Sequence, residues 1–322
     1  MYFFSPIIAV LVTYFLTYFL LSNKVAKRVQ DLPNERSLHS TPVIRIGGVG
    51  FMAGVLSGWA FIFTSLTWWV VFPLLTLFVV SMLDDMRGLS VRYRLLVHIV
   101  AAWLLVMGCG LFAQSVPIGI MVMLLTIWSI NLYNFMDGSD GLAGGMALIG
   151  FGTYGVAAMM ANDISFAMVN FSISAAALSF LYFNFYPARI FMGDAGSIPL
   201  GFLVAASGIW GWQGGLWPAW FPFLVFSPFV LDATVTLFRR GFRREKIWQA
   251  HREHYYQRMV QMGMGHRNTA IIEYIYMVCS GTSALFALVY PATTTIVLSV
   301  WGVIFGASML MLDYFWKIRK SV

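Results

Sequence analysis

The sequence predicts an all-α, polytopic integral membrane protein whose single membrane-embedded domain covers residues 1–322. Hydrophobic residues make up 60% of the chain and charged residues only 10%, whereas soluble domains carry roughly 25% charged residues. The apolar residues form long continuous runs without the period-2 alternation of a membrane β-barrel strand. This composition excludes a soluble enzyme, a disordered chain and a secreted disulfide scaffold, because so much apolar surface needs a lipid environment.

We count about eleven apolar stretches that are long enough to cross the bilayer as helices, which takes roughly 17–25 residues each. In chain order they cover residues 2–22, 46–65, 67–83, 95–112, 117–135, 141–160, 165–185, 197–213, 217–238, 270–289 and 293–314.

The positive charges predict the orientation of these spans. With the N-terminus outside and eleven crossings, all 20 Lys and Arg residues fall in inner segments, and the outer loops carry a single charge, Asp163. Lys and Arg concentrate on the cytoplasmic side of membrane proteins, so we expect a cytoplasmic C-terminus. The net charge of +7 is explained by basic loops that face anionic lipids and predicts no nucleic-acid partner. The inner segments are 23–45, 84–94, 136–140, 186–196, 239–269 and 315–322.

Other motifs have a purely structural interpretation. The run Gly48-Val-Gly50-Phe-Met-Ala53 formally matches a dinucleotide fingerprint, but it opens a membrane helix, so small-residue helix packing is the better interpretation. Cys109 and Cys279 lie in apolar spans, without metal-ligand spacing or an expected disulfide. We expect His98 to pack within the fourth span, and His39 and His266 to be loop residues or to make minor contacts.

Carboxylates collect at the inner ends of three spans. Asp84-Asp85 ends the third span, Asp137 and Asp140 follow the fifth, and Asp194 follows the seventh. Acids are costly near a bilayer, so their placement is informative. Aspartates at helix ends often only cap the helix, but three such motifs on one face predict one shared site.

Carboxylate and amide oxygens at a membrane surface suit a hard divalent cation that holds phosphates. Arg94, Arg189 and Arg252 are placed to meet anionic oxygens. Asp232 lies deeper in the ninth span, as either a substrate-cavity residue or the partner of a nearby Arg. His251 and His254 lie in the largest inner loop and belong either to the shared site or, alternatively, to an ordinary surface loop.

At these residues the sequence resembles a known family, the polyprenyl-phosphate N-acetylhexosamine-1-phosphate transferases. The resemblance runs along nearly the whole chain, with the motifs in family order. They are the first inner loop at 33–48, the paired-aspartate loop at 84–94, the Asn/Asp segment at 131–141 and Met192-Gly-Asp-Ala-Gly-Ser197. The catalytic loops are therefore expected near 23–45, 84–94, 131–141, 186–197 and 239–269.

The resemblance implies that undecaprenyl phosphate attacks the β-phosphorus of a UDP-N-acetylhexosamine and that UMP leaves. This reaction starts O-antigen-like surface polysaccharides at the inner membrane of bacteria. The implied metal is Mg²⁺, or Mn²⁺, with Asp194 and Asn134 as ligands, while Asp84 and Asp85 are the catalytic residues that position the lipid phosphate and the metal. A phosphate monoester has a second pKa of about 6, so the lipid phosphate is already mostly deprotonated at neutral pH. We therefore favour a direct attack in which Asp85 orients the reacting groups over a covalent phospho-aspartate.

The remaining residues are expected to contact the nucleotide, the diphosphate or the sugar. They are Arg45, Arg94, Asn131, Asp137, Asp140, Arg189, His251, Arg252 and His254.

The last inner loop departs from the pattern of many family members. It carries only two histidines, His251 and His254, where many members have a tighter cluster, and this form resembles the O-antigen-initiating branch. The sugar stays open between UDP-GlcNAc and a 6-deoxy relative, and so does the oligomeric state, with a homodimer as one option. The rival interpretations are a secondary transporter, which would place its acids near the midplane, and a CDP-alcohol phosphotransferase, whose DG-x-x-A-R element is absent.

Overall fold

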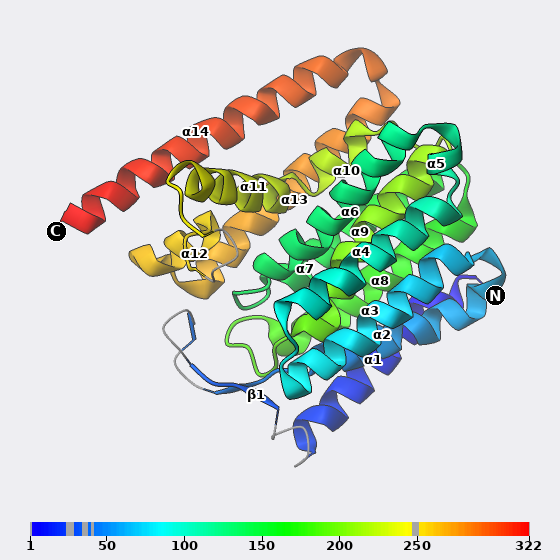
Figure 1. Cartoon of the computed structure of the whole chain (residues 1–322), viewed down its shortest axis with the longest axis horizontal. Helices are drawn as coiled ribbons and strands as arrows, with labels where there is room; N and C mark the ends of the chain where they lie inside the picture. Colours follow the sequence, from blue (N-terminus) through cyan, green and yellow to red (C-terminus); the bar gives the residue numbers. More distant parts are fainter. Residues whose placement is uncertain (1, 24–28, 34–37, 40–41, 247–250, 322) are drawn as a thin grey trace.

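The computed structural model describes residues 2–23, 29–33, 38–39, 42–246 and 251–321. Ten helical segments among these residues are long and apolar enough to cross a membrane, which confirms the predicted all-α membrane architecture. The N-terminus and the C-terminus lie at opposite ends of the molecule (Figure 1). Four cations of the predicted first inner loop, Lys24, Lys27, Arg28 and Arg36, lie outside the described residues.

The elements follow the predicted spans closely. In chain order they are α1 (Phe4–Ser22), β1 (Gln30–Asp31), β2 (Val43–Ile44), α2 (Gly47–Trp59), the 3₁₀ turn η2 (Ala60–Ser65), α3 (Trp68–Arg87), α4 (Val91–Gly108), α5 (Leu111–Gln114), α6 (Val116–Phe135), α7 (Leu142–Met160), α8 (Ile164–Asn184), α9 (Asp194–Gln213), α10 (Trp220–Val225), α11 (Ser227–Phe242), α12 (Tyr255–Met259), the π-type turn η3 (Val260–Met264), α13 (Gly265–Val289), the 3₁₀ turn η4 (Pro291–Thr293) and α14 (Thr294–Ser321).

The ninth predicted span, 217–238, differs from the prediction of one continuous helix. It is divided into the short α10 and the longer α11, and the helix is interrupted at Phe226. The physical reason lies in Pro228, which lacks the N–H that would bond to the Leu224 carbonyl in an unbroken helix; Pro222 lies in the first turn of α10, where an N–H would have no acceptor within the helix. The Ser227 hydroxyl donates to the Leu224 carbonyl at 2.7 Å and satisfies one backbone group at the break.

Small residues bring α1 and α2 into close contact. A Cβ added at Gly54 would lie 1.9 Å from the Thr13 hydroxyl oxygen, and one added at Gly50 would lie 2.5 Å from that of Thr17. Gly48 instead faces the start of α9, where its added Cβ would lie 2.3 Å from the Gly196 nitrogen. The predicted small-residue packing is therefore confirmed, because each of these glycines allows a neighbouring helix to approach.

The core is densest around α7, α8 and α9, where most side chains are buried. Tyr154 stacks on Trp217 with ring centroids 5.0 Å apart, and Phe166 packs against Trp210 at 4.7 Å. By contrast, α1 and α14 lie at opposite edges of the molecule (Figure 1) and expose many large apolar side chains. This contrast is the one expected when lipid, rather than water, surrounds a helical bundle.

Candidate active site

The acids of α3 and α9 meet through an arginine of α4. Arg94 Nη1 lies 2.9 Å from Asp84 Oδ2 and 2.9 Å from Asp194 Oδ2, so one guanidinium joins the two carboxylates. The Asp194 side chain is 6% exposed and that of Arg94 is 31% exposed. The expected convergence of Asp84 and Asp194 is therefore confirmed, although the two lie 110 residues apart in the chain.

Arg45 approaches the same carboxylates from the other side. Its Nη2 donates to Asp194 Oδ1 at 2.6 Å and lies 3.2 Å from Asp85 Oδ1. Burial opposes the charge of Arg45, but the carboxylates of Asp194 and Asp85 outweigh it and raise the pKa of the guanidinium above its usual value. We call Asp84, Asp85, Asp194, Arg45 and Arg94 the acid cluster.

Backbone hydrogen bonds hold Arg45 in place. The Phe191 N–H donates to the Ile44 carbonyl at 2.7 Å, and the N–H groups of Gly47 and Gly48 donate to the carbonyls of Phe191 and Met192 at 2.9 and 2.8 Å. The chain that enters α2 therefore runs beside the chain that enters α9, and Arg45 and Asp194 come from these two segments.

Asp85 holds the beginning of α9. Its Oδ1 accepts from the Asp194 N–H at 3.1 Å and its Oδ2 from the Ala195 N–H at 2.8 Å, and the side chain is 1% exposed. A carboxylate at this position accepts from N–H groups that have no partner within the helix, and the positive end of the helix dipole stabilises its negative charge. The preceding Gly193 has φ of +69°, and an added Cβ would lie 2.8 Å from Asp85 Oδ2, so this entry to α9 requires glycine.

Asn134, at the end of α6, reaches the same region through Ser197. The Ser197 hydroxyl donates to Asn134 Oδ1 at 3.1 Å and lies 3.0 Å from the Gly193 carbonyl oxygen. Ser197 therefore links Asn134 to the first turn of α9, which begins at Asp194. Ser197 was not singled out from the sequence, although it belongs to the motif 192–197.

Three carboxylates face two guanidinium groups in the acid cluster, so the formal count of ionisable groups has one more acid than bases. Mg²⁺ binds hard oxygen ligands and is typically held by one or two carboxylates together with substrate phosphates. No group of three His, Cys, Asp or Glu side chains in the described part of the chain has metal-holding geometry. Asp194 accepts from Arg45 at Oδ1 and from Arg94 at Oδ2, and Asn134 Oδ1 accepts from Ser197, so a cation held by these two residues would share their oxygens with these donors.

Asp137 and Asp140, on the loop after α6, have different surroundings. None of the hydrogen bonds or ion pairs between described residues uses the Asp137 carboxylate, and burial raises the pKa of this group well above its usual value. Asp140 is buried, and its Oδ2 accepts from the Ala188 N–H at 2.9 Å. Asp137 is thus the more available of the two for a ligand.

His266 was expected to be a loop residue or to make minor contacts, but it lies in the first turn of α13 and makes several contacts. Its Nδ1 lies 2.9 Å from the Ser139 hydroxyl and 3.7 Å from Asp140 Oδ1, and its ring stacks with Tyr186. Its Nε2 lies 3.3 Å from the Leu38 carbonyl. The imidazole therefore joins three loops around the acid cluster, a role that no local sequence signal indicates.

The histidine loop is held by Asp232 of α11. Asp232 Oδ1 accepts from the Tyr255 N–H at 2.8 Å, Oδ2 accepts from the Tyr256 N–H at 3.0 Å, and His254 Nδ1 lies 3.2 Å from Oδ1. Asp232 therefore caps α12 and orients His254. This arrangement differs from both sequence interpretations, because Asp232 forms no ion pair with an Arg among the described residues and its carboxylate is occupied by α12.

His251 lies beside His254, with ring centroids 4.9 Å apart. Burial, the neighbouring His254 and Arg240 together lower the pKa of His251 to about 4. The side chain of Arg252 is exposed. Residues 247–250 of this loop lie outside the described part of the chain.

No hydrogen bond or ion pair between described residues joins Arg189 or Asn131 to the acid cluster, although the Asn131 side chain meets that of His98, near Arg94 and Asp84. The Arg189 guanidinium sits over the rings of Tyr182 and Phe183, each at 5.0 Å, and donates to the Tyr182 carbonyl. Asn131 donates from Nδ2 to the Ile127 carbonyl of its own helix at 2.7 Å. As expected, His98 is buried within α4.

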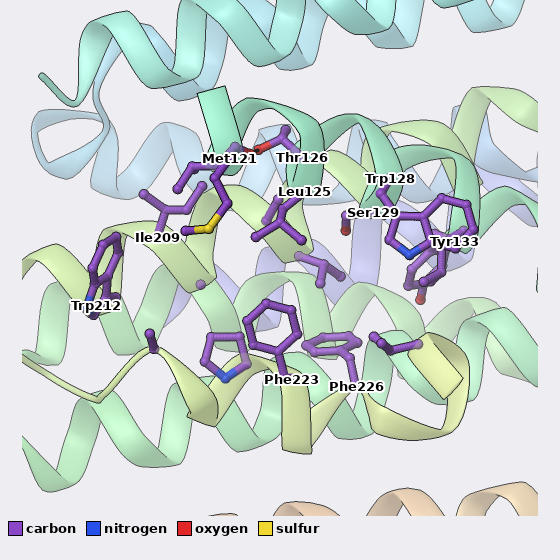
Figure 2. Close-up of a pocket in the computed structure, with 18 residues that line it drawn as sticks. Met121, Leu125, Thr126, Trp128, Ser129, Tyr133, Ile209, Trp212, Phe223 and Phe226 are labelled. Carbon is purple, nitrogen blue, oxygen red and sulfur yellow. Dashed lines mark hydrogen bonds between the residues drawn. The ribbon is translucent and has the colours of Figure 1, made fainter. Parts of the chain in front are cut away.

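An apolar pocket lies between α6, α9 and the α10–α11 segment, with a volume of about 200 Å³. Figure 2 shows Tyr133 at one end and Trp212 at the other, with Phe223 and Phe226 along one wall. The hydroxyls of Thr126 and Ser129 donate to backbone carbonyls at 2.8 and 2.7 Å, so their hydrogen atoms are not available to a ligand in the pocket. Tyr133 directly precedes Asn134 in α6, so this end of the pocket lies one residue along the helix from Asn134.

Comparison with known proteins assigns the family. The sequence profile described as Glycosyl transferase family 4 matches residues 67–211. A Bacillus subtilis protein named "Probable undecaprenyl-phosphate N-acetylglucosaminyl 1-phosphate transferase" is 30% identical over 263 residues, which is 76% of this chain and 73% of that protein. The chain belongs to this family of polyprenyl-phosphate sugar-1-phosphate transferases. It is thus a phosphoglycosyltransferase, as the motifs predicted.

Two further relatives are similar over comparable lengths. A Mycobacterium leprae decaprenyl-phosphate N-acetylglucosaminephosphotransferase is 27% identical over 84% of this chain and 79% of its own. A Yersinia pestis undecaprenyl-phosphate alpha-N-acetylglucosaminyl 1-phosphate transferase is 25% identical over 80% of this chain and 77% of its own.

Proposed function

We propose that this enzyme transfers N-acetylhexosamine 1-phosphate from a UDP-sugar to undecaprenyl phosphate and releases UMP. The observation that carries the proposal is the acid cluster, in which carboxylates and guanidinium groups from separate helices meet at one end of the bundle. Such a group of charges suits the handling of phosphates. The relatives' names, which pair a polyprenyl phosphate with N-acetylglucosamine, support UDP-GlcNAc as the first sugar to test. A UDP-6-deoxy sugar is the alternative.

The reaction brings a phosphate anion onto a diphosphate. An oxygen of the polyprenyl phosphate attacks the β-phosphorus, the bond from that phosphorus to the bridging oxygen breaks, and UMP leaves with the bond's electrons. Each like-charge pair at ~4 Å costs about 4 kcal/mol at an effective dielectric of 20. Arg45 and Arg94 offset part of this repulsion. Asp194 and Asn134 would hold Mg²⁺, or Mn²⁺, which would supply further positive charge to the phosphate oxygens.

Direct attack agrees better with the surroundings of Asp85 than a covalent intermediate does. Both Asp85 oxygens accept N–H groups of α9 and the side chain is buried, so it orients Asp194 instead of offering a free nucleophile. Incubation with UDP-GlcNAc radiolabelled at the β-phosphate, without lipid acceptor, tests this step. Radiolabel that stays bound to the wild-type protein but not to Asp84→Asn or Asp85→Asn would show a covalent route.

The polyprenyl chain is proposed to lie in the apolar pocket of Figure 2, which has Tyr133, the residue before Asn134, at one end. Along α6 the lining residues run from Met121 to Tyr133, a rise of about 18 Å at 1.5 Å per residue. An isoprenoid tail carries no hydrogen-bonding groups, so an apolar wall suits it.

The site is proposed to face the cytoplasm of a bacterium, in its inner membrane, where the product would begin an O-antigen-like surface polysaccharide. The arginines near the acid cluster, Arg45, Arg87, Arg92 and Arg94, favour this orientation because cations stay on the cytoplasmic side. UDP-sugars would be available there.

The test is a reconstituted transfer assay. Purified protein is mixed with undecaprenyl phosphate, Mg²⁺ and a panel of UDP-sugars, and UMP release and a lipid-linked sugar diphosphate are both measured. The proposal predicts lipid-dependent UMP release with at least one UDP-N-acetylhexosamine. UMP release that does not need the lipid, or no release with any such sugar, would contradict it.

A further inference from the structure

The C-terminal helix α14 carries one acid, Asp313, in an otherwise apolar sequence from Thr294 to Phe315. Large side chains on either side of it, such as Leu310 and Tyr314, are exposed. A carboxylate in a membrane helix is costly and needs a specific partner. The partners of Asp313 therefore indicate what the acid does.

Asp313 accepts from residues of two other helices. Arg239 Nη1, at the end of α11, lies 2.6 Å from Asp313 Oδ1, and Arg258 Nη1, in α12, lies 2.9 Å from the same oxygen. The Tyr255 hydroxyl lies 3.4 Å from Oδ2, and the Arg258 guanidinium sits 5.0 Å from the Tyr255 ring centroid. The Arg258 side chain is 6% exposed, so its charge depends on the partly exposed carboxylates of Asp313 and Glu253 nearby.

These contacts hold α12, the short helix that follows the histidine loop. α12 has only five residues before the π-type turn η3 separates it from α13, so contacts with its neighbours contribute to its position. Asp232 of α11 holds the backbone of Tyr255 and Tyr256, and the Tyr256 hydroxyl donates to the Phe135 carbonyl of α6 at 3.0 Å. Asp313 supplies the third attachment, because it contacts the Arg258 guanidinium and the Tyr255 hydroxyl of α12.

We propose that Asp313 is a positioning residue for the transfer reaction. By neutralising Arg239 and Arg258 it fixes α12, and α12 in turn fixes His254, which stacks between Phe135 and Tyr256. The effect on turnover rests on the proposed function, in which the histidine loop contacts the UDP-sugar. The effect on α12 itself does not.

The experiment compares Asp313→Asn, which removes the charge, with Asp313→Glu, which keeps it. The matched control is Ser308→Ala, which removes the 2.5 Å contact between Ser308 and Tyr276 that holds α14 to α13 but does not touch α12. Amide hydrogen exchange of peptides covering 251–262 is measured in full-length protein in detergent. Kinetics use UDP-GlcNAc and undecaprenyl phosphate.

In Asp313→Asn we expect faster exchange confined to 251–262, and kcat/KM for UDP-GlcNAc reduced about tenfold or more with the KM for undecaprenyl phosphate unchanged. Asp313→Glu should restore both, and Ser308→Ala should match the wild type. Wild-type exchange and kinetics in Asp313→Asn would overturn the proposal, and so would exchange that rises equally throughout α13 and α14. If the wild type does not turn over UDP-GlcNAc, the proposed substrate fails while the exchange comparison still decides the role of Asp313.

Discussion

The two neighbouring aspartates at the end of α3 hold different partners. Asp84 faces Arg94, whereas Asp85 turns into the start of α9 and accepts two backbone N–H groups. The sequence motif locates both residues and predicts their site, because adjacent acids at a membrane surface are rarely placed by chance. It cannot separate their roles, since those follow from a helix that begins 109 residues later.

At the same scale, Asp232 is predicted to contribute strongly to stability. Asp232→Asn leaves one of the N–H groups of Tyr255 and Tyr256 with a weaker acceptor and brings the new amide N–H₂ close to the other. We therefore expect the free energy of unfolding to fall by about 2–3 kcal/mol. Thr236→Val removes a single 3.2 Å hydrogen bond to the same carboxylate and should cost about 1 kcal/mol or less. Thermal unfolding midpoints in detergent check this. Equal effects of the two variants would show that Asp232 is not the cap of α12.

The lowered pKa of His251 makes a prediction about pH. Because burial, His254 and Arg240 lower the pKa from 6.5 to about 4, the ring is already neutral well below neutral pH and takes up no proton between about pH 5.5 and 8. His251→Gln should therefore change the level of kcat/KM but not the shape of its pH profile in this range. A limb near pH 6.5 that disappears in the variant would contradict the prediction.

The elements were largely predictable from hydropathy, and the exception has a visible cause. Ten predicted spans correspond to long helices, but the stretch 217–238 is broken, and Pro228 marks the break in the sequence itself. A hydropathy average over a window takes no account of missing backbone N–H groups, so it predicts one continuous helix even where a proline interrupts it. The break matters because α10 and α11 form one wall of the apolar pocket.

Two neighbouring leucines of α6 test that pocket. Leu125 lines it, whereas Leu124 does not line it and is 57% exposed on the outside of the bundle. Leu125→Trp should fill the pocket and raise the KM for undecaprenyl phosphate about tenfold, with the KM for UDP-GlcNAc unchanged. Leu124→Trp, the same change one residue earlier, should behave as the wild type. Equal effects on the lipid KM would place the polyprenyl chain elsewhere.

For the whole molecule, the main result is that acids from distant parts of the chain meet at one end of a helical bundle. Their presence on one face was predictable from span counting and charge, because each span reverses the direction of the chain. The role of Arg45 as a second bridge was not, because it depends on the parallel run of residues 44–48 and 190–192. The link through Ser197 to Asn134 was not either, because it depends on how the end of α6 meets the first turn of α9. Hydrogen bonds of this kind leave no periodic trace in a sequence.

The central claim is that Asp194 and its neighbours hold a divalent cation together with the substrate phosphates. The most direct test is Mn²⁺ binding followed by electron paramagnetic resonance, in the presence of UDP-GlcNAc, for the wild type, Asp194→Asn and Asp163→Asn. Asp163 caps α8 by accepting from the Phe166 N–H and lies outside the acid cluster, so its variant controls for loss of charge. We predict that Asp194→Asn weakens Mn²⁺ binding about 100-fold or more and that Asp163→Asn binds Mn²⁺ as the wild type does. Unchanged Mn²⁺ binding in Asp194→Asn would contradict the account.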